Sequence, residues 1–213
     1  MPDLQIEKRH LAAGKGPIIG IDEAGRGPWA GPVTAAAFWL NPDFFGQLPS
    51  DLNDSKKLSP VKRAAIYTAL TMGEHAFSVV SIAASKIDQI GILNATFLAM
   101  QRAAKSLQHN LIRRQHAAIG LCLVDGNLDP GLDMPVKMVI KGDALSYSIA
   151  AASIIAKETR DRLMRDLARD HADYGWDRNM GYGTKGHLEA LRLHGVSQHH
   201  RRSFAPIKNF LQR

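Results

Sequence analysis

The sequence predicts an α/β protein built on a mixed β-sheet that is flanked by helices and followed by a helical C-terminal extension. Apolar runs of strand length come first, and strands and helices then alternate along the chain. No internal repeat, low-complexity tract or linker divides the 213 residues, which are enough for one full core. We therefore expect one domain over 1–213, with a short N-terminal tail at 1–16 and a basic helical part over about 171–213.

The expected strands are apolar runs that end at turn-forming or acidic residues. The first begins at Ile18 and is rich in β-branched side chains, which suit a strand covered on both faces. Four further runs have a similar character: 32–40, 76–83, 117–124 and 136–140. These runs supply the strands of the mixed sheet.

The expected helices are marked by capping residues and by apolar residues at helical spacing. Ser59 can cap a helix that runs to about residue 72, and Pro60 suits its first position. The longest helix begins near Ala144 and keeps one apolar face for about six turns. Thr184 caps a short helix that Gly195 ends. Two further stretches, 85–90 and 94–108, also have helical character.

The chain is basic, which hints at a polyanionic partner. Its net charge is +7 and its pI is about 9.7. From residue 185 onward, Glu189 is the one acid against the basic residues Lys185, Arg192, Arg201, Arg202, Lys208 and Arg213. A solvated basic surface explains this tail as well as phosphate contact does, so charge alone does not choose between them.

Nothing in the sequence marks secretion or insertion into a membrane. No apolar run approaches the roughly 18 residues of a spanning helix. Residues 1–7 lack the basic start and the apolar segment of a signal peptide. The single cysteine, Cys122, lies in an apolar run and is expected to be a buried, inert thiol. These features favour a cytoplasmic protein.

Two adjacent acids, Asp22 and Glu23, follow the first apolar run, and Gly25-Arg26-Gly27 comes just after them. A strand interior is a poor place for both, because uncompensated buried charge is costly. Neighbouring side chains of a strand point to opposite faces, so both acids can serve one site only if the strand ends or bends here. Glycines permit such a bend and let backbone amides approach a ligand. The alternative is a strand end followed by an ordinary turn.

Acidic residues recur at the ends of later strands. Asp125 closes the run at 117–124, and Asp143 follows the run at 136–140. Sites assemble at strand ends in open α/β sheets, and carboxylates without cysteine or histidine ligand spacing favour Mg²⁺ or Mn²⁺. Two such ions can activate water and stabilise the leaving oxygen of a phosphodiester. The alternatives are that Asp143 is a helix N-cap and that Asp125 is a turn aspartate.

Several motifs stand in a definite order along the chain. The first is Gly-Ile-Asp-Glu-Ala-Gly-Arg-Gly-Pro at 20–28, followed by Gly-Pro-Val at 31–33. The others are Asp-Ser-Lys-Lys-Leu at 54–58, Val-Asp-Gly at 124–126, Lys-Gly-Asp at 141–143, Ala-Ala-Ser-Ile-Ile-Ala-Lys at 151–157, Gly-Tyr-Gly-Thr at 181–184 and His-Arg-Arg-Ser-Phe at 200–204. Over about 17–206 the chain therefore resembles the bacterial ribonuclease HII family, and the ordered set is far more specific than a lone glycine-rich loop.

The resemblance implies an RNase H-like fold and an endonuclease. Its substrates would be the RNA strand of RNA–DNA hybrids and ribonucleotides embedded in duplex DNA, cut on their 5′ side, as in ribonucleotide excision repair. Asp22, Glu23, Asp125 and Asp143 would be the catalytic residues and would hold Mg²⁺ or Mn²⁺, in a site for two ions. Metal-activated water would be the nucleophile, and the products would carry 5′-phosphate and 3′-hydroxyl ends.

The resemblance also implies which residues bind the substrate. Gly25-Arg26-Gly27 would read the RNA-to-DNA junction through the ribose 2′-hydroxyl and neighbouring phosphates. Tyr182 would pack on the following deoxyribose, with a core tyrosine in a tight turn as the alternative. Lys56 and Lys57 would contact the nucleic-acid backbone, which supplies affinity but no sequence choice. A solvated lysine pair is the alternative for these two.

The expected partners are hybrids and ribonucleotide-containing duplexes, with no membrane and a monomeric chain; no segment can be assigned to a sliding clamp. Met180 departs from the family pattern, which has a small or basic residue there. Only 17 residues precede Ile18, which leaves no room for the extra N-terminal domain of the related ribonuclease HIII. Two other classes remain open: a non-catalytic binder of hybrids and another metal-dependent phosphoesterase on a related fold.

Overall fold

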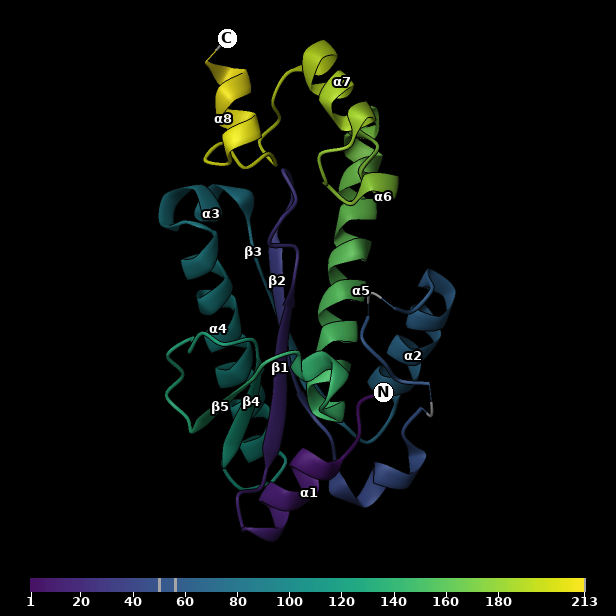
Figure 1. Cartoon of the computed structure of the whole chain (residues 1–213), viewed down its shortest axis with the longest axis vertical. Helices are drawn as coiled ribbons and strands as arrows, with labels where there is room; N and C mark the ends of the chain where they lie inside the picture. The colour runs from purple at the N-terminus through teal and green to yellow at the C-terminus, as the bar shows by residue number, and fades with distance from the viewer. Residues whose placement is uncertain (50, 56, 213) are drawn as a thin grey trace.

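A computed structural model of the chain describes residues 1–49, 51–55 and 57–212. Its centre is a five-stranded mixed sheet in the order β3-β2-β1-β4-β5. The strands are β1 (Ile18–Ala24), β2 (Val33–Trp39), β3 (Ala76–Ile82), β4 (Leu121–Asp125) and β5 (Val136–Val139). β2 pairs antiparallel with both β1 and β3, whereas β4 and β5 continue the sheet in parallel on the other side of β1 (Figure 1). The expected mixed sheet is confirmed.

Two long helices, α4 (Ile92–Arg113) and α5 (Tyr147–Asp170), cover opposite faces of the sheet (Figure 1). The other helices are α1 (Gln5–Ala12), α2 (Pro60–Met72), α3 (Ala84–Ile90), α6 (Trp176–Asn179), α7 (Lys185–His194) and α8 (Ala205–Leu211). Short 3₁₀ turns are η1 (Pro42–Gln47), η2 (Gly142–Ala144) and η3 (Ala172–Tyr174). Helix α1 lies at one end of the molecule, and α6, α7 and α8 gather at the other with the C-terminus.

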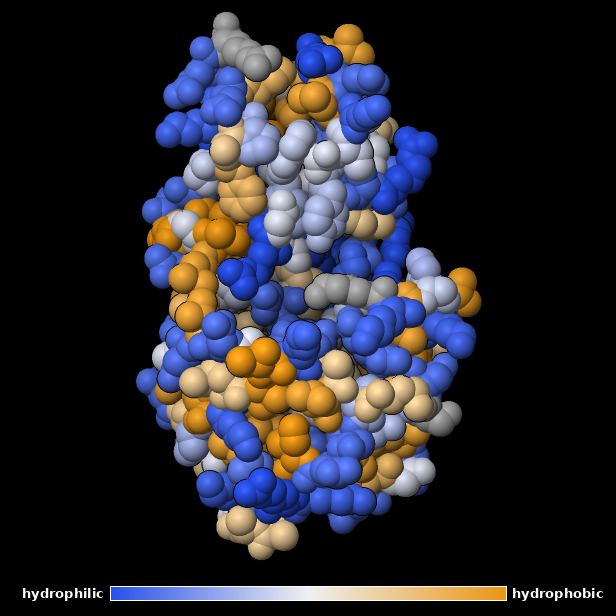
Figure 2. Space-filling view, in the orientation of Figure 1, coloured by the Kyte–Doolittle hydropathy of each residue, from blue (hydrophilic) through white to orange (hydrophobic). Residues whose placement is uncertain are grey.

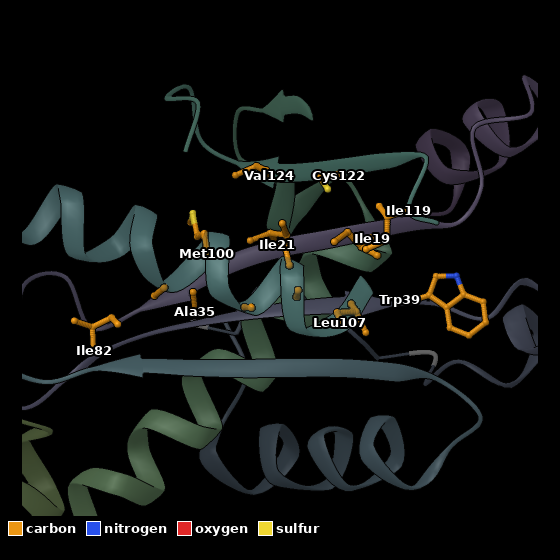
Figure 3. Packing of buried hydrophobic residues seen from close by; sticks show 14 of the residues in the cluster. Ile19, Ile21, Ala35, Trp39, Ile82, Met100, Leu107, Ile119, Cys122 and Val124 are labelled. Carbon is orange, nitrogen blue, oxygen red and sulfur yellow. The ribbon is translucent and has the colours of Figure 1, made fainter. Parts of the chain in front are cut away.

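The sheet face under α4 carries a large apolar core. Ile19 and Ile21 of β1 pack there with Met100 and Leu107 of α4 (Figure 3). Each of these side chains is at most 3% exposed, and burying one is worth about 1.5–3 kcal/mol. The odd-numbered side chains of β1 therefore face α4.

The opposite face of β1 meets α5 at close range, because the helix presents small residues there. Ala150, Ala151 and Ala152 of α5 are fully buried. A Cβ atom at Gly20 of β1 would overlap the main chain of Ser148, so the contact requires glycine. This packing sets α5 against the strand that carries Asp22.

The expected helix starts are mostly confirmed. The side-chain oxygens of Ser59 and Thr184 cap α2 and α7, accepting backbone N–H groups at 3.3 and 3.2 Å. Helix α5 starts at Tyr147 rather than near Ala144, because η2 comes first and Ser146 is the cap. Asp143 is therefore not the N-cap of the long helix.

The segment 1–16, expected as a short tail, contains helix α1. Its buried residue is Glu7, which is only 2% exposed. A helix that buries a carboxylate has no regular apolar stripe, which is why the hydrophobic pattern did not indicate it. Across the described ranges, no helix combines the length and the apolar character needed to cross a membrane.

Candidate active site

The acidic residues lie where three neighbouring parallel strands end. Ile21 of β1 is paired with Val124 of β4, so Asp22 and Asp125 follow at the same level of the sheet. Asp125 is in turn paired with Val139 of β5, and Asp143 follows in η2. Parallel strands bring their carboxyl ends to one edge, where α/β sheets place their sites. The structure thus gathers acids that are more than 100 residues apart in the chain.

The first strand ends one residue after the acidic pair, not at the pair itself. β1 continues to Ala24 and stays paired with β2 beyond Asp22 and Glu23. At the level of the acidic pair it is the neighbouring strand that ends, because β4 stops at Asp125. Glu23 faces the α4 side, where it borders a cavity of about 90 Å³ with Asp125. Asp22 faces α5, yet both acids lie beside the edge that β4 leaves open.

Asp22 is a buried acid whose ionisation is strongly perturbed. Its side chain is 6% exposed, and Oδ1 accepts the backbone N–H of Glu23 at 2.7 Å. Burial is the largest cause that raises the pKa of Asp22 well above its ordinary value, followed by the negative charges of Glu23 and Asp125. The three carboxylates are therefore close enough to repel one another. A bound cation would relieve this repulsion.

Asp125 connects the end of β4 to the turn that carries Asp143. Its Oδ1 accepts the backbone N–H of Gly142 at 2.7 Å. A Cβ atom at Gly142 would overlap Ile149 and lie 3.3 Å from this same oxygen. The side chain thus bridges two strand ends, which is more than the turn aspartate considered as the alternative would do.

The donor chemistry fits a hard divalent cation. Asp22, Glu23, Asp125 and Asp143 offer carboxylate oxygens only, the ligands that Mg²⁺ and Mn²⁺ prefer. Within the described residues, no three His, Cys, Asp or Glu side chains are gathered tightly enough to define a metal site by distance alone. The fit therefore depends on oxygen donors at adjoining strand ends and on the repulsion at Asp22.

The predicted junction-reading elements lie side by side. Arg26 and Gly27 are exposed in the loop that follows β1, and Arg26 Nη1 lies 3.5 Å from Glu23 Oε1. A Cβ atom at Gly27 would lie 3.7 Å from the ring of Tyr182, which is 47% exposed. Tyr182 is thus a surface residue beside the glycine loop, not the core tyrosine of the alternative. In Figure 2, hydrophilic side chains cross the middle of the molecule, between the C-terminal helices and the lower part of the sheet.

The lysine pair is only partly described. Lys56 lies outside the described residues. Lys57 is exposed, and its Nζ lies 3.9 Å from Asp54 Oδ2. The loop is anchored to α5, because Ser55 Oγ lies 2.8 Å from Ser153 Oγ, and Ser153 also hydrogen-bonds Asp22. This anchor places Lys57 near the acidic site.

Two arginines that contact the Gly-Arg-Gly loop were not predicted. Arg201 was grouped with the basic tail, as a solvated or phosphate-binding residue, but it is fully buried. Arg160 of α5 is 1% exposed and was not singled out. Both donate hydrogen bonds to main-chain carbonyls of residues 25–32. The only signal for Arg201 was its position in the His-Arg-Arg-Ser-Phe motif.

The fold and the acidic edge define a metal-dependent nuclease with the RNase H fold. The ribonuclease H2 of Pyrococcus horikoshii OT3 superposes with a TM-score of 0.76 at 25% identity, covering 92% of this chain and 97% of that one. Bst-RNase HIII in complex with Mn²⁺ also gives 0.76, at 21% identity over 92% and 69% of the two chains. RNase HII in its complex with PCNA from Archaeoglobus fulgidus gives 0.63 at 23% identity, over 86% and 93%.

Within that class, the sequence identifies the family. The ribonuclease HII family model matches residues 19–207, and the chain belongs to this family. Ribonuclease HII of Ruegeria pomeroyi is 50% identical, with 99% of this chain and 85% of that protein aligned. Ribonuclease HII of Gluconobacter oxydans is 48% identical over 100% and 97%. Membership supports ribonuclease H endonuclease activity on RNA–DNA hybrids.

Proposed function

We propose that this chain cuts the RNA strand of hybrids and also cuts duplex DNA on the 5′ side of a single embedded ribonucleotide, leaving 5′-phosphate and 3′-hydroxyl ends. The observation that carries this proposal is the adjacency of Tyr182 and Gly27 beside the acidic edge. One surface there combines a hydrolytic site with a loop and a ring that can compare two consecutive sugars. This arrangement suits an RNA-to-DNA junction better than a uniform strand.

The acids would hold two divalent ions, Mg²⁺ or Mn²⁺. Such ions supply an activated water and stabilise the leaving oxygen of the phosphodiester. Asp125 is oriented for this role by the N–H of Gly142, and Asp22 by the N–H of Glu23 and by Ser153 of α5. No thiol nucleophile is at hand, because Cys122 is buried and its pKa is raised to about 12. The protein's part is therefore to place and orient oxygen ligands.

Substrate choice would come from the two sugars that flank the RNA-to-DNA junction, the ribose that follows the cut and the sugar after it. Backbone amides of Gly25-Arg26-Gly27 can bond the 2′-hydroxyl and phosphates, and the 2′-hydroxyl distinguishes RNA from DNA. The ring of Tyr182 would pack on the next sugar, where a second 2′-hydroxyl would clash. Lys57, and Lys56 outside the described residues, would contact the phosphate backbone without reading sequence.

The test is a cleavage assay on a DNA duplex that carries one ribonucleotide, with Mn²⁺ or Mg²⁺ present. We expect a single cut on its 5′ side. Asp125→Asn should abolish cleavage while keeping the fold, because an amide oxygen can still accept the Gly142 N–H. Asp129→Asn is the matched control, since Asp129 Oδ1 likewise accepts a loop N–H, that of Gly131 at 2.8 Å. Intact substrate under both metals, or cleavage by Asp125→Asn, contradicts the proposal.

The assembly state is also part of the proposal. We expect a monomer whose substrates are nucleic acids. Contact with a sliding clamp, at a segment not yet assigned, is a further part of the proposal. The solved PCNA complex of a related RNase HII motivates the clamp, although it identifies no contact segment in this chain. Light scattering after size-exclusion chromatography measures the mass directly, and a dimer mass contradicts the monomer.

A further inference from the structure

Two arginines are buried behind the Gly-Arg-Gly loop without a carboxylate partner. Arg160 comes from α5 and Arg201 from the segment before α8, and they are 1% and 0% exposed. In the part of the chain that the structure describes, neither makes an ion pair. Charged groups are rarely buried unless they are paired or fully hydrogen-bonded. Their N–H groups must therefore be satisfied by acceptors other than carboxylates.

The N–H groups of Arg201 donate hydrogen bonds to carbonyls at both ends of the loop. Its Nη1 donates to Arg26 O at 2.8 Å, and its Nη2 donates to Gly25 O at 2.5 Å. Nε and Nη2 donate to Gly31 O and Pro32 O, each at 3.0 Å. The rigid planar fork of arginine suits such a multiple contact. One side chain thus holds the two ends of the loop together.

Arg160 connects the same loop to the segment that carries Tyr182. Its Nε donates to Pro32 O at 2.9 Å, and its Nη2 donates to Ala30 O at 3.3 Å. Its Nη1 donates to Met180 O at 3.1 Å, two residues before Tyr182. The glycine loop and the tyrosine loop therefore share one buried support.

This support determines which way the loop amides point. In a trans peptide, the C=O of one residue and the N–H of the next point in opposite directions. Because Gly25 O and Arg26 O point inward to Arg201, the N–H groups of Arg26 and Gly27 point outward. Both residues are exposed, and among the described residues no acceptor is found for these two N–H groups. They are free to bond a substrate.

The buried charges add to this effect. Burial, and then the charge of Arg160, lowers the pKa of Arg201 to about 9, so it stays protonated at neutral pH. Two positive charges thus lie behind the outward amides, with Asp88 and Asp161 acting on them only from beyond ion-pair distance. Backbone N–H groups of this kind form anion-binding concavities, and a positive charge behind them favours a phosphate.

We propose that Arg201 and Arg160 are positioning residues for junction reading: Arg201 turns the Arg26 and Gly27 amides toward the substrate, Arg160 joins this loop to the loop of Tyr182, and both supply a positive field from behind. This inference rests on the proposed function of the Gly-Arg-Gly loop. It separates these two arginines from those of the basic surface, because they act through the loop without touching nucleic acid. A purely structural role would affect stability but not the choice between substrates.

The test compares Arg201→Lys with the wild type on two substrates, a single-ribonucleotide duplex and a uniform hybrid. Lysine keeps the charge but cannot span four carbonyls, so kcat/KM for the single ribonucleotide should fall about tenfold more than for the hybrid. Arg169→Lys is the control, because Arg169 is 81% exposed in a surface pair with Asp166. An unchanged ratio in Arg201→Lys overturns the inference. A wild type without junction preference overturns the proposed function instead.

A second measurement needs no variant and so survives a failure of Arg201→Lys to fold. Amide hydrogen exchange by NMR on the wild-type chain should find the Arg26 and Gly27 N–H groups unprotected. The nearby Trp29 N–H, bonded to Gly181 O at 2.8 Å, is the protected reference. Exchange at Arg26 and Gly27 as slow as at Trp29 overturns the outward orientation.

Discussion

The Nε2 atoms of His187 and His200 lie 3.0 Å apart, and their other partners decide which one carries the proton. Nδ1 of His187 lies 2.9 Å from Tyr182 O, which can only accept, so His187 is protonated on Nδ1. Nδ1 of His200 accepts the backbone N–H of Ser197 at 3.0 Å, so the proton of His200 is on Nε2. His200 therefore donates to His187, and His187 donates to the main chain of Tyr182. Two neutral imidazole rings, linked by a hydrogen bond, thus hold the main chain at Tyr182 in place.

Acid is expected to destabilise the protein through this pair. Burial, and then His187, lowers the pKa of His200 from 6.5 to about 3, and burial also lowers the pKa of His187. When the pH falls below 6.5, the ordinary pKa of histidine, the unfolded chain binds protons that the native chain does not. The free energy of unfolding therefore falls as pH falls. The slope is up to about 1.4 kcal/mol per pH unit for each histidine.

Urea denaturation between about pH 7.5 and about pH 5 measures this slope. His200→Gln removes one of the two titrating groups and should flatten the curve. His109→Gln is the control, because His109 is exposed on α4 and should leave the slope unchanged. Equal slopes in wild type and His200→Gln would show that the buried pair is not the origin of the pH dependence.

Replacing Asp22 with asparagine is expected to stabilise the metal-free protein while removing activity. A raised native pKa means that ionised Asp22 costs stability at neutral pH, chiefly through burial and then through Glu23 and Asp125. Asparagine keeps an acceptor for the Glu23 N–H and removes the charge. The free energy of unfolding should rise by on the order of 1 kcal/mol. Cleavage should fall at least about 100-fold, since lost outer-shell contacts alone cost up to that much.

Chemical denaturation without divalent metal, together with the cleavage assay, tests both effects. Asp133→Asn is the control, because Asp133 is exposed in a loop and should change stability by less than about 0.5 kcal/mol. A less stable Asp22→Asn protein contradicts the proposed repulsion. A fully active one contradicts the assignment of Asp22 as a ligand.

The role of Tyr182 is tested by separating its ring from its hydroxyl. Stacking or packing of one ring on a nucleotide is worth roughly 1–3 kcal/mol, so Tyr182→Ala should lower the ratio of junction to hybrid cleavage about tenfold. Tyr182→Phe keeps the ring beside Gly27 and should keep the ratio. Steady-state kinetics on both substrates gives the ratio. If Tyr182→Ala cuts both substrates with the wild-type ratio, the ring does not read the junction.

Sequence reasoning located the acids because their placement is a local property. Asp125 and Asp143 each follow an apolar run, and those runs are the parallel strands β4 and β5. The continuation of β1 past Asp22 was not predictable in the same way. It depends on pairing with β2, as between Ala24 and Thr34, which no local pattern reveals.

Burial of polar residues was the other feature that the sequence concealed. Arg201 contacts carbonyls about 170 residues away in the chain, which the sequence does not reveal. Its place among the basic residues of the tail wrongly suggested a surface position. His187 and His200 were visible only as part of a basic tail, because their bonds depend on how the loops around α7 fold back. The contact of Lys56 with nucleic acid stays a prediction, since that residue lies outside the described ranges.

Glu7 is expected to stabilise the start of α5, and Glu7→Ala should reveal this. Its Oε1 accepts three hydrogen bonds, from Ser146 Oγ at 2.6 Å, Ser148 Oγ at 2.7 Å and Ser148 N at 2.9 Å. Alanine leaves the buried N–H of Ser148 without its acceptor and leaves the two hydroxyls, 3.0 Å apart, only each other, which costs about 1–3 kcal/mol. Urea unfolding measures the loss, with Glu189→Ala as the control because Glu189 is exposed on α7. Equal stability of the two variants would mean that the carboxylate does not hold the first turn of α5.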